Sequence, residues 1–511
     1  MKKALSLLLA IVLLLVAAYS AGAWYLGTQV ELAINEPYRQ IASVPYVKIV
    51  KREYRRGVFS SEETVTFELF GDMLRFMEQA QKQSAAGSPG GAVAAAEPFK
   101  PIAVTVRSHI KHGPLPDGKN LAAAIVDSEV EVDERFKRDL AKVLGDKKPL
   151  TAHTVYGYEG DGESIVTSPA FVTTLPGAGS DPAVQLSWEG VRANIRFTKD
   201  FASYTLQGEA PKLEVAGGKG VHMMVGGMRF DIESKRIFED EPLLYSGKQK
   251  FTIAQASIGG PGMGDRPFLL KQVTYDVNMP VNGEFIDIVA KFGVQDALLG
   301  ESNFGPAHYD FSVKRLHART FAQLNRAMMQ MYSDPAAMNA GADPAAALGA
   351  LAKPALNLLE YNPEISIDRI SFKIPQGEVL VAARAKFNDV KPEDLKQPPV
   401  LIAKVDASAD IALPEGLLMM PFGMKSDSPE ALQTQMQMRQ KQVAALAEQG
   451  YIQRDGAMIR SRIEFRSGQL TINGKPFDPK ALQAASVPPE PAVRQKESKP
   501  GVARKQSRRG K

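Results

Sequence analysis

Residues 54–61 read YRRGVFSS, a stretch in which two arginines and a glycine separate two segments with strand character. We expect Tyr54 to end one strand and Phe59 to begin the next, because Gly57 allows a turn geometry that a side chain opposes. The second strand continues over 64–69, where Thr and Glu alternate with Val, Phe and Leu. The stretch therefore predicts a corner between two strands.

The same alternation of apolar and polar residues recurs along the chain. It is clear over 102–111, over 365–374 and over 379–387, and the last two are joined by Pro-Gln-Gly at 375–377. A Pro-x-Gly turn between two alternating runs predicts a hairpin. Near the end, Asn473 and Gly474 predict a tight turn of the same kind.

Helical patterns are fewer. Apolar residues recur at helical spacing over 132–144, 315–332 and 429–449. We therefore expect an α+β, mostly β protein, in which an N-terminal transmembrane helix precedes an elongated, largely antiparallel β-sheet body with a few amphipathic helices. Such a sheet has one apolar face that must be covered or closed.

The N-terminus carries the strongest single signal. Residues 4–26 hold no charge, and at 1.5 Å per residue they span roughly the 30 Å hydrocarbon core of a bilayer. Lys2 and Lys3 precede them, so we expect the N-terminus in the cytoplasm and the body exported. The alternative is a signal peptide cleaved after Ala23, where small residues are found.

The expected organisation has five parts. It comprises an anchor at 1–27, a β-rich N-lobe at 28–332 with a flexible loop at 80–97, an Ala/Pro-rich connection at 333–354, a β-rich C-lobe at 355–484 with a helix at 429–449, and a disordered basic tail at 485–511.

Charge and cysteine content exclude several classes of function. The chain of 511 residues has no cysteine, so neither disulfides nor thiol chemistry operate. Its net charge is +5, but residues 1–25 contribute +2 and the tail 485–511 contributes +6, which leaves −3 on the body. A slightly acidic body is not expected to bind nucleic acid, which requires a basic face.

Three motifs, in this order, resemble those of the YdgA-like family, also described as domain of unknown function 945. They are YRRGVFSS at 54–61, HGPLP at 112–116 and a closing segment from Gly450 that ends in GQLTINGKP at 468–476. The resemblance implies a bacterial protein with one N-terminal anchor, a large exported body and no established catalytic residues. A more distant similarity to AsmA-like proteins implies long sheets that curl into apolar grooves. The motif residues expected to be structural are Tyr54, Gly57, Phe59, Ser61, His112, Gly113, Pro114, Asn473 and Gly474.

No residue pattern indicates catalysis, a metal or a cofactor. His109 and His112 are three apart in a predicted strand, where such residues face opposite sides, so they are not expected to share a metal; His112 is expected to bond the turn backbone. No G-x-S-x-G or phosphate loop occurs. The acidic pairs Glu62-Glu63 and 239–241 are expected to be solvated, as are Arg55 and Arg56, whose alternative is contact with lipid phosphates.

These observations predict a non-enzymatic protein of the bacterial inner membrane, single-pass, with its body in the periplasm. Its partners would be the membrane, a lipid bound to the apolar sheet face, or a second copy of the chain. The first alternative is a purely structural scaffold or homodimer without ligand. The second is a hydrolase with an unrecognised site.

Overall fold

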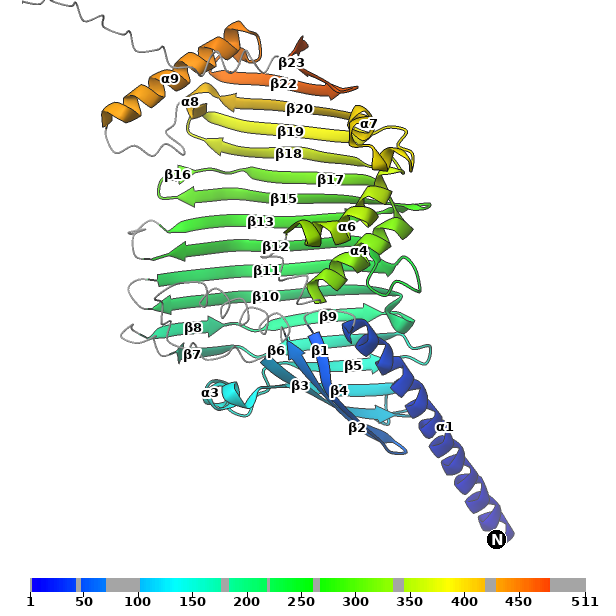
Figure 1. The fold of residues 1–511 in the computed structure, drawn as a ribbon. Helices are drawn as coiled ribbons and strands as arrows, with labels where there is room; N and C mark the ends of the chain where they lie inside the picture. Colours follow the sequence, from blue (N-terminus) through cyan, green and yellow to red (C-terminus); the bar gives the residue numbers. More distant parts are fainter. Residues whose placement is uncertain are drawn as a thin grey trace, which may run out of the picture.

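The computed structural model describes residues 2–42, 47–69, 102–175, 183–217, 221–260, 267–333, 344–418 and 429–477. Within them the chain forms one sheet of 24 strands, with helices along its edges and on one side (Figure 1). The predicted loop 80–97 and tail 485–511 lie outside the described residues, as does most of the first half of the connection 333–354.

The helices follow the order of the chain. They are α1 (Lys2–Ala42), α3 (Glu134–Leu144), η1 (Lys199–Phe201), α4 (Ala318–Ser333), α6 (Pro344–Leu359), η2 (Asp394–Lys396), α7 (Pro398–Ala403), α8 (Glu415–Leu418) and α9 (Pro429–Glu448). The strands before α4 are β1 (Val47–Arg56), β2 (Ser60–Leu69), β3 (Ile102–His112), β4 (Ala124–Val132), β5 (Thr151–Tyr156), β6 (Gly162–Ser168), β7 (Phe171–Leu175), β8 (Val184–Trp188), β9 (Val191–Phe197), β10 (Ser203–Gly217), β11 (Val221–Arg236), β12 (Tyr245–Gly259), β13 (Phe268–Met279), β14 (Val281–Asn282), β15 (Phe285–Leu299), β16 (Ser302–Asn303) and β17 (Ala307–His317). Those after it are β18 (Glu364–Ile374), β19 (Gly377–Phe387), β20 (Val405–Pro414), β21 (Gln453–Asp455), β22 (Met458–Arg466), β23 (Gln469–Ile472) and β24 (Lys475–Pro476).

Neighbouring strands in this sheet are antiparallel throughout. Their spatial order is β1, β2, β3, β4, β5, β6, β9, β10, β11, β12, β13, β15, β17, β18, β19, β20, β22, β23 and β24. The short strand β8 pairs with the second half of β10, and β7 pairs with β8. The mostly β, largely antiparallel class predicted from the sequence is confirmed, including the hairpin of β18 and β19 around Pro375–Gly377.

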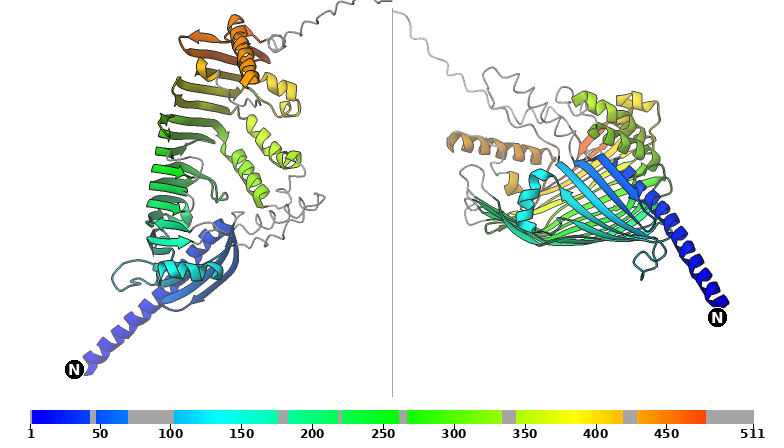
Figure 2. Two further views of the ribbon diagram at one scale, coloured as in Figure 1. Left: turned by 90° about the vertical axis from the view of Figure 1, so that its left-hand side faces the viewer. Right: turned by 90° about the horizontal axis from the view of Figure 1, so that it is seen from below.

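One face of the sheet is apolar and carries the helical packing. Residues directly opposite each other on paired strands lie on the same face. Followed from strand to strand, this pairing places Ile110 on β3 and Ala290 on β15 on one face. On this apolar face Val30 and Ile34 of α1 pack against Ile110 at one end. Further along, α4 packs against the same face, and Figure 2 shows α4 and α6 on one side of the sheet.

The N-terminal helix differs from the one expected. It does not end at 27 but continues as α1 to Ala42, because Val30 and Ile34, past the apolar run, bury their side chains against the sheet. Among the described residues, no helix combines the length and the apolar character needed to cross a bilayer. The side chains of residues 2–11, which form the first part of the predicted anchor, lie outside the described part of the chain.

Other boundaries shift by a few residues. The turn in YRRGVFSS is shorter than expected, because β1 continues to Arg56 and β2 begins at Ser60. The helix predicted at 315–332 begins at Ala318, because β17 continues to His317. The expected lobe boundary falls between β17 and β18, and these two strands pair directly, so the sheet is continuous there.

Candidate functional site

Five adjacent strands each place an aromatic side chain in one row on the apolar face. Direct cross-strand pairing aligns Phe230, Phe251, Tyr275, Phe292 and Tyr309, which we call the aromatic row. The ring centroids of Tyr275 and Phe292 lie 4.8 Å apart and those of Phe292 and Tyr309 lie 6.0 Å apart, within the range that aromatic pairs prefer. At about 4.8 Å per strand the row is about 19 Å long.

The aromatic row is partly open to solvent. Phe292 and Tyr309 are 36% and 46% exposed, and the other three side chains are half-buried. A parallel row of Met228, Ile253, Val273 and Val294 runs beside it on the same face. A continuous, accessible apolar strip of this kind is suited to an apolar ligand or partner.

The opposite face is charged along the same strands. Directly opposed positions alternate in sign, in the order Asp231, Lys250, Asp276, Lys291, Asp310 and Arg369. Arg369 Nε lies 3.2 Å from Asp310 Oδ2. Pairs of opposite charge at such positions stabilise a register by about 0.2–1 kcal/mol each. This face therefore aligns the strands, and it is solvated except at Asp310, which is buried.

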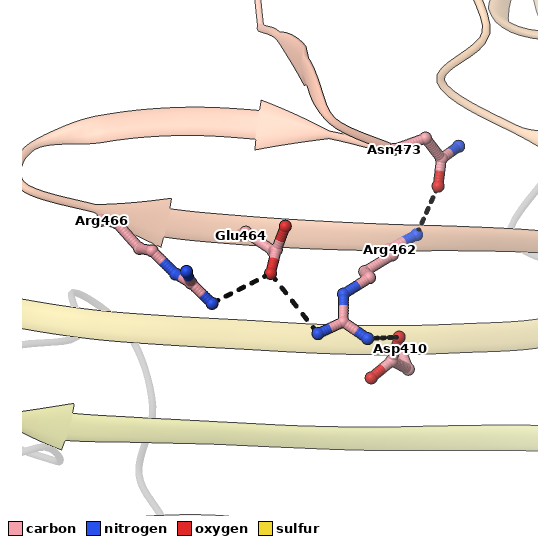
Figure 3. Close-up of polar contacts among 5 residues, drawn as sticks. All are labelled: Asp410, Arg462, Glu464, Arg466 and Asn473. Atoms are coloured by element: carbon pink, nitrogen blue, oxygen red, sulfur yellow. Dashed lines mark hydrogen bonds and ion pairs between the residues drawn. The ribbon is translucent and has the colours of Figure 1, made fainter.

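The charged face continues to the C-terminal end of the sheet, where Figure 3 shows its last network. The guanidinium of Arg462 on β22 lies 3.4 Å from Asp410 on β20 and 3.4 Å from Glu464. Asn473 joins this network through its Oδ1, which accepts the backbone N–H of Arg462 at 2.8 Å. These side chains link adjacent strands and are at least partly solvent-accessible.

Asn473 and Gly474 form the predicted tight turn, between β23 and β24. Both have positive φ, 50° and 79°, as a two-residue hairpin turn of type I′ requires. The Nδ2 of Asn473 also donates to the carbonyl of Gly450, just beyond the end of α9, at 3.0 Å. This motif therefore ties α9 to the last strands, at the end of the sheet far from α1 (Figure 1).

The other seven motif residues gather where α1 crosses the edge of the sheet. Phe59 stacks on Tyr19 of α1, with ring centroids 6.0 Å apart. Gly113 has a φ of 137°, and a Cβ there would lie 3.2 Å from the Cβ of Ala23. Tyr54 packs against the cluster that contains Val30.

Gly57 lies in the turn between β1 and β2, where a side chain is opposed by a close contact and not by a positive φ. Its φ is not in the positive region, but a Cβ there would lie 2.7 Å from the carbonyl oxygen of Ser60, to which the Gly57 N–H donates at 2.8 Å. Arg56 beside it is neither free nor solely solvated, because it pairs with Glu31 at 3.3 Å and lies over the ring of Trp24.

His112 fastens α1 to the sheet. Its side chain is 1% exposed, with Nδ1 3.0 Å from the carbonyl oxygen of Ala23 and Nε2 3.0 Å from the hydroxyl of Ser61. A carbonyl oxygen only accepts, so Nδ1 carries the proton and Nε2 accepts from Ser61. The expected bond to the turn backbone is therefore replaced by one to the backbone of α1. Burial lowers the pKa of His112, which keeps the ring neutral.

The pair of Ser61 and His112 is placed for packing and not for nucleophilic attack. Both side chains are at most 2% exposed, and the contact lies beneath α1, where Gly27 passes over the ring. A Cβ on Gly27 would lie 2.6 Å from Cε1 of His112, so the helix approaches as closely as glycine permits. No reactant reaches this hydroxyl without separation of α1 from the sheet.

Glu63 corrects the expectation that both acids of Glu62-Glu63 are solvated. Its side chain is 1% exposed; it accepts hydrogen bonds from Arg52 Nε at 2.7 Å and from Tyr38 Oη of α1 at 3.0 Å. Burial and the adjacent carboxylate raise the pKa of Tyr38. Glu241 is also buried and paired with Arg326 at 3.1 Å. Glu62 and Glu63 point to opposite faces of β2, and Glu241 lies in the connection between β11 and β12, so in both cases burial depends on contacts with a distant element.

His109 and His112 lie on opposite faces of β3, as the strand pattern predicts. His109 lines a hollow of about 810 Å³ on the charged face together with Asp127 and His153, whose Nδ1 lies 2.7 Å from Asp127 Oδ1. In the described part of the chain, no three His, Asp or Glu side chains are grouped closely enough to hold a metal ion.

The comparison with known proteins identifies a family. A family model described as "Bacterial protein of unknown function (DUF945)" matches residues 1–480, which is nearly the whole chain. No curated protein and no solved structure matches. The resemblance to domain of unknown function 945 is confirmed, and the similarity to AsmA-like proteins is not shown by these comparisons.

Proposed function

The chain belongs to the DUF945 family of bacterial proteins, and we propose that it is a non-enzymatic envelope protein that binds the acyl chain of a lipid along its aromatic row. In this proposal the first part of α1 anchors the chain in the inner membrane, with the N-terminus in the cytoplasm and the sheet in the periplasm. The proposal separates an anchoring element from a binding face, and each has its own support.

The anchor is supported by the sequence and by the contacts of α1. Residues 4–26 are uncharged, and Lys2 and Lys3 precede them. Side chains that are described in this run project into solvent, including Leu14 at 69% exposure. Retention of the segment after export is supported by Tyr19 and Ala23, which contact Phe59 and His112, because cleavage after Ala23 would remove part of the interface.

The observation that carries the binding proposal is the aromatic row. It offers about 19 Å of apolar surface, and an acyl chain in one leaflet reaches about 15 Å, half of the hydrocarbon core. At the positions next to the row, the charged side chains of Asp231, Lys250, Asp276 and Lys291 lie on the opposite face, so there the two faces differ sharply in the ligand that they favour. An acyl chain laid across the strands would contact one ring per strand.

The test is native mass spectrometry of the full-length chain released from nanodiscs of phosphatidylethanolamine and phosphatidylglycerol. We expect a lipid adduct in the wild type. Phe292→Gln places an amide in the row and should weaken retention about tenfold, since burying half of a phenylalanine contributes about 1–1.5 kcal/mol. Lys291→Gln, at the next residue on the charged face, is the matched control and should leave the adduct unchanged.

Three other outcomes are informative. A ligand-free dimer whose dissociation is promoted by Phe292→Gln would replace lipid with a second copy of the chain as the occupant of the row. A ligand-free monomer would refute the binding proposal and favour a structural scaffold. Hydrolytic activity that disappears with one polar substitution, while the fold is retained, would overturn the non-enzymatic assignment.

A further inference from the structure

Several turns at one edge of the sheet expose apolar side chains around α1. Val58 and Phe59 lie between β1 and β2, Leu121 lies between β3 and β4, and Tyr158 lies between β5 and β6. Their exposed fractions are 47%, 50%, 79% and 52%. We call these four residues the collar. Single exposed apolar residues are common, but four on the adjacent turns of one sheet edge require an explanation.

The collar is attached to α1 at the level of Tyr19. Tyr19 stacks on Phe59, and its hydroxyl donates to the carbonyl of Leu115 at 3.0 Å. Tyr158 donates to the carbonyl of Pro114 in the same β3–β4 turn at 2.7 Å. The turn that carries Leu121 is closed by a bond from the Gly113 N–H to the Ala123 carbonyl at 3.1 Å. The turns and the helix therefore form one contiguous assembly.

The position of this attachment constrains the membrane. Of the uncharged run, residues 4–18 precede it and extend about 22 Å along a helix, whereas the hydrocarbon core is about 30 Å thick. The uncharged run continues to Leu26, about 10 Å beyond the collar level. A bilayer that covers the whole uncharged run must therefore also cover the collar.

We propose that Val58, Phe59, Leu121 and Tyr158 are inserted into the periplasmic leaflet of the membrane that α1 crosses, so that the body is docked on the bilayer. The partner of this surface is a phospholipid bilayer, and the inference rests on the proposed anchor. An insertion depth of about 5–10 Å is that of other interfacial apolar elements and accounts for the shortfall of about 8 Å in the free helix. Trp24 and Tyr25, 51% and 58% exposed, then lie at the level where interfacial aromatics are favoured.

Charged groups also lie in and beside the turns that carry the collar. Asp117 in the β3–β4 turn accepts the backbone N–H groups of Lys119 and Asn120, at 2.9 and 2.8 Å, so its carboxylate is held within its own turn. Arg56 is paired with Glu31 on the body side of Trp24. Lys119 and Glu159 are exposed in the same turns as Leu121 and Tyr158, so the placement requires their charges to lie at the level of the lipid headgroups.

The absence of cysteine allows a direct measurement of depth. A single nitroxide is attached to Val58→Cys or Leu121→Cys in the full-length chain, reconstituted in vesicles of phosphatidylethanolamine and phosphatidylglycerol. Collision with oxygen is compared with collision with a water-soluble nickel chelate. Leu14→Cys reports the anchor, and Val172→Cys, on β7 and 59% exposed, is the aqueous control. Circular dichroism verifies that each labelled chain keeps the wild-type sheet content.

We expect labels at 14, 58 and 121 to favour oxygen, with 58 and 121 about 5–10 Å below the phosphates, and the label at 172 to favour the chelate. If 14 lies in the bilayer while 58 and 121 match 172, the collar proposal is overturned and the anchor remains. If 14 also matches 172, the anchor itself is refuted.

Discussion

The contact between Gly27 and His112 gives the most discriminating prediction, because two ordinary effects oppose each other there. Gly27 lies inside α1, where replacing glycine with alanine normally stabilises a helix by about 1 kcal/mol. At this position the added Cβ would lie 2.6 Å from Cε1 and 2.7 Å from Nδ1 of a ring that is 1% exposed. We expect Gly27→Ala to be destabilising.

The magnitude follows from the displacement required. An ordinary carbon contact is about 3.5–4.0 Å, so the helix or the ring must move by about 1 Å. Overpacking of this size costs about 1–3 kcal/mol. The movement also stretches the 3.0 Å bond from His112 to the Ala23 carbonyl, and an unmade buried bond costs about 1–3 kcal/mol. After subtraction of the gain in helix propensity, the docking of α1 should weaken by about 2–3 kcal/mol.

The assay uses Trp24, which lies beneath Arg56 and reports separation of α1 from the sheet. In a Trp188→Phe background its fluorescence is followed through a urea titration of the full-length chain in mild detergent. Gly22→Ala is the matched control, since a Cβ there would meet its nearest neighbour, Pro114 Cγ, at 3.7 Å, an ordinary contact. We expect Gly22→Ala to leave the midpoint unchanged or slightly raised.

A double-mutant cycle isolates the contact. In a His112→Ser background the ring is absent, and Gly27→Ala should then cost nothing or stabilise, which gives a coupling free energy of about 2 kcal/mol or more. An equal cost in both backgrounds would refute the reasoning, because the penalty would then not arise from the ring. An unchanged midpoint for Gly27→Ala alone would refute it equally.

Three further perturbations test other contacts by the midpoint of urea unfolding. Glu63→Gln should destabilise by about 1–3 kcal/mol, because it removes the buried carboxylate that accepts hydrogen bonds from Arg52 and Tyr38. The exposed neighbour Glu62→Gln should change little, and equal effects would contradict the burial assignment. Burial lowers the pKa of His112, so the ring takes up a proton in the unfolded state first as the pH falls below about 6.5. The free energy of unfolding of the wild type should therefore be highest above that pH and decrease below it. In His112→Asn the decrease should be smaller. Asn473→Ala should cost about 2 kcal/mol, since it loses two hydrogen bonds and alanine tolerates a φ of 50° less well than asparagine. Asn473→Gly, which relieves the φ, should cost less, and an equal cost for both would show that the turn conformation contributes nothing.

The sequence predicted the structural features that depend on short-range patterns of residues. The alternation on both sides of Pro375–Gly377 is local, and it fixed a hairpin that the structure contains. Glu62 and Glu63 show the limit: they are adjacent and identical in type, and only the face of β2 decides that one is solvated and the other buried. Hydropathy likewise indicated an apolar run that ends near Leu26 but not that α1 continues to Ala42, because that extension depends on a distant sheet.

The aromatic row could not be predicted, because it depends on the register of strands far apart in the chain. Phe230 and Tyr309 align only through three intervening strands. A bulge between Ile286 and Ile288 changes the alignment of β15 with β17, and a second changes that of β17 with β18 between Asp310 and Phe311. One residue of slip moves a whole set of side chains to the other face. Aromatic residues at period two are visible in the sequence, but their alignment is not.

The geometry also limits how a lipid reaches the row. The second half of α1 covers the apolar face at β3 and β4. The row begins on β11, five strands beyond β4 and about 24 Å further along the sheet at about 4.8 Å per strand. An acyl chain bound there has left the bilayer completely, and each methylene loses about 0.8 kcal/mol of burial unless the protein replaces it. An open sheet contacts only one side of an acyl chain, so it restores about half of the free energy that the methylenes lose. Stable binding therefore requires a second apolar surface over the row, and in the native mass spectrum of the full-length chain the lipid should appear chiefly on the species that provides one. Lipid carried by a dimer, and absent from the monomer at equal detergent concentration, would show that a second copy of this chain is that surface; lipid carried equally by the monomer would contradict the half-coverage argument.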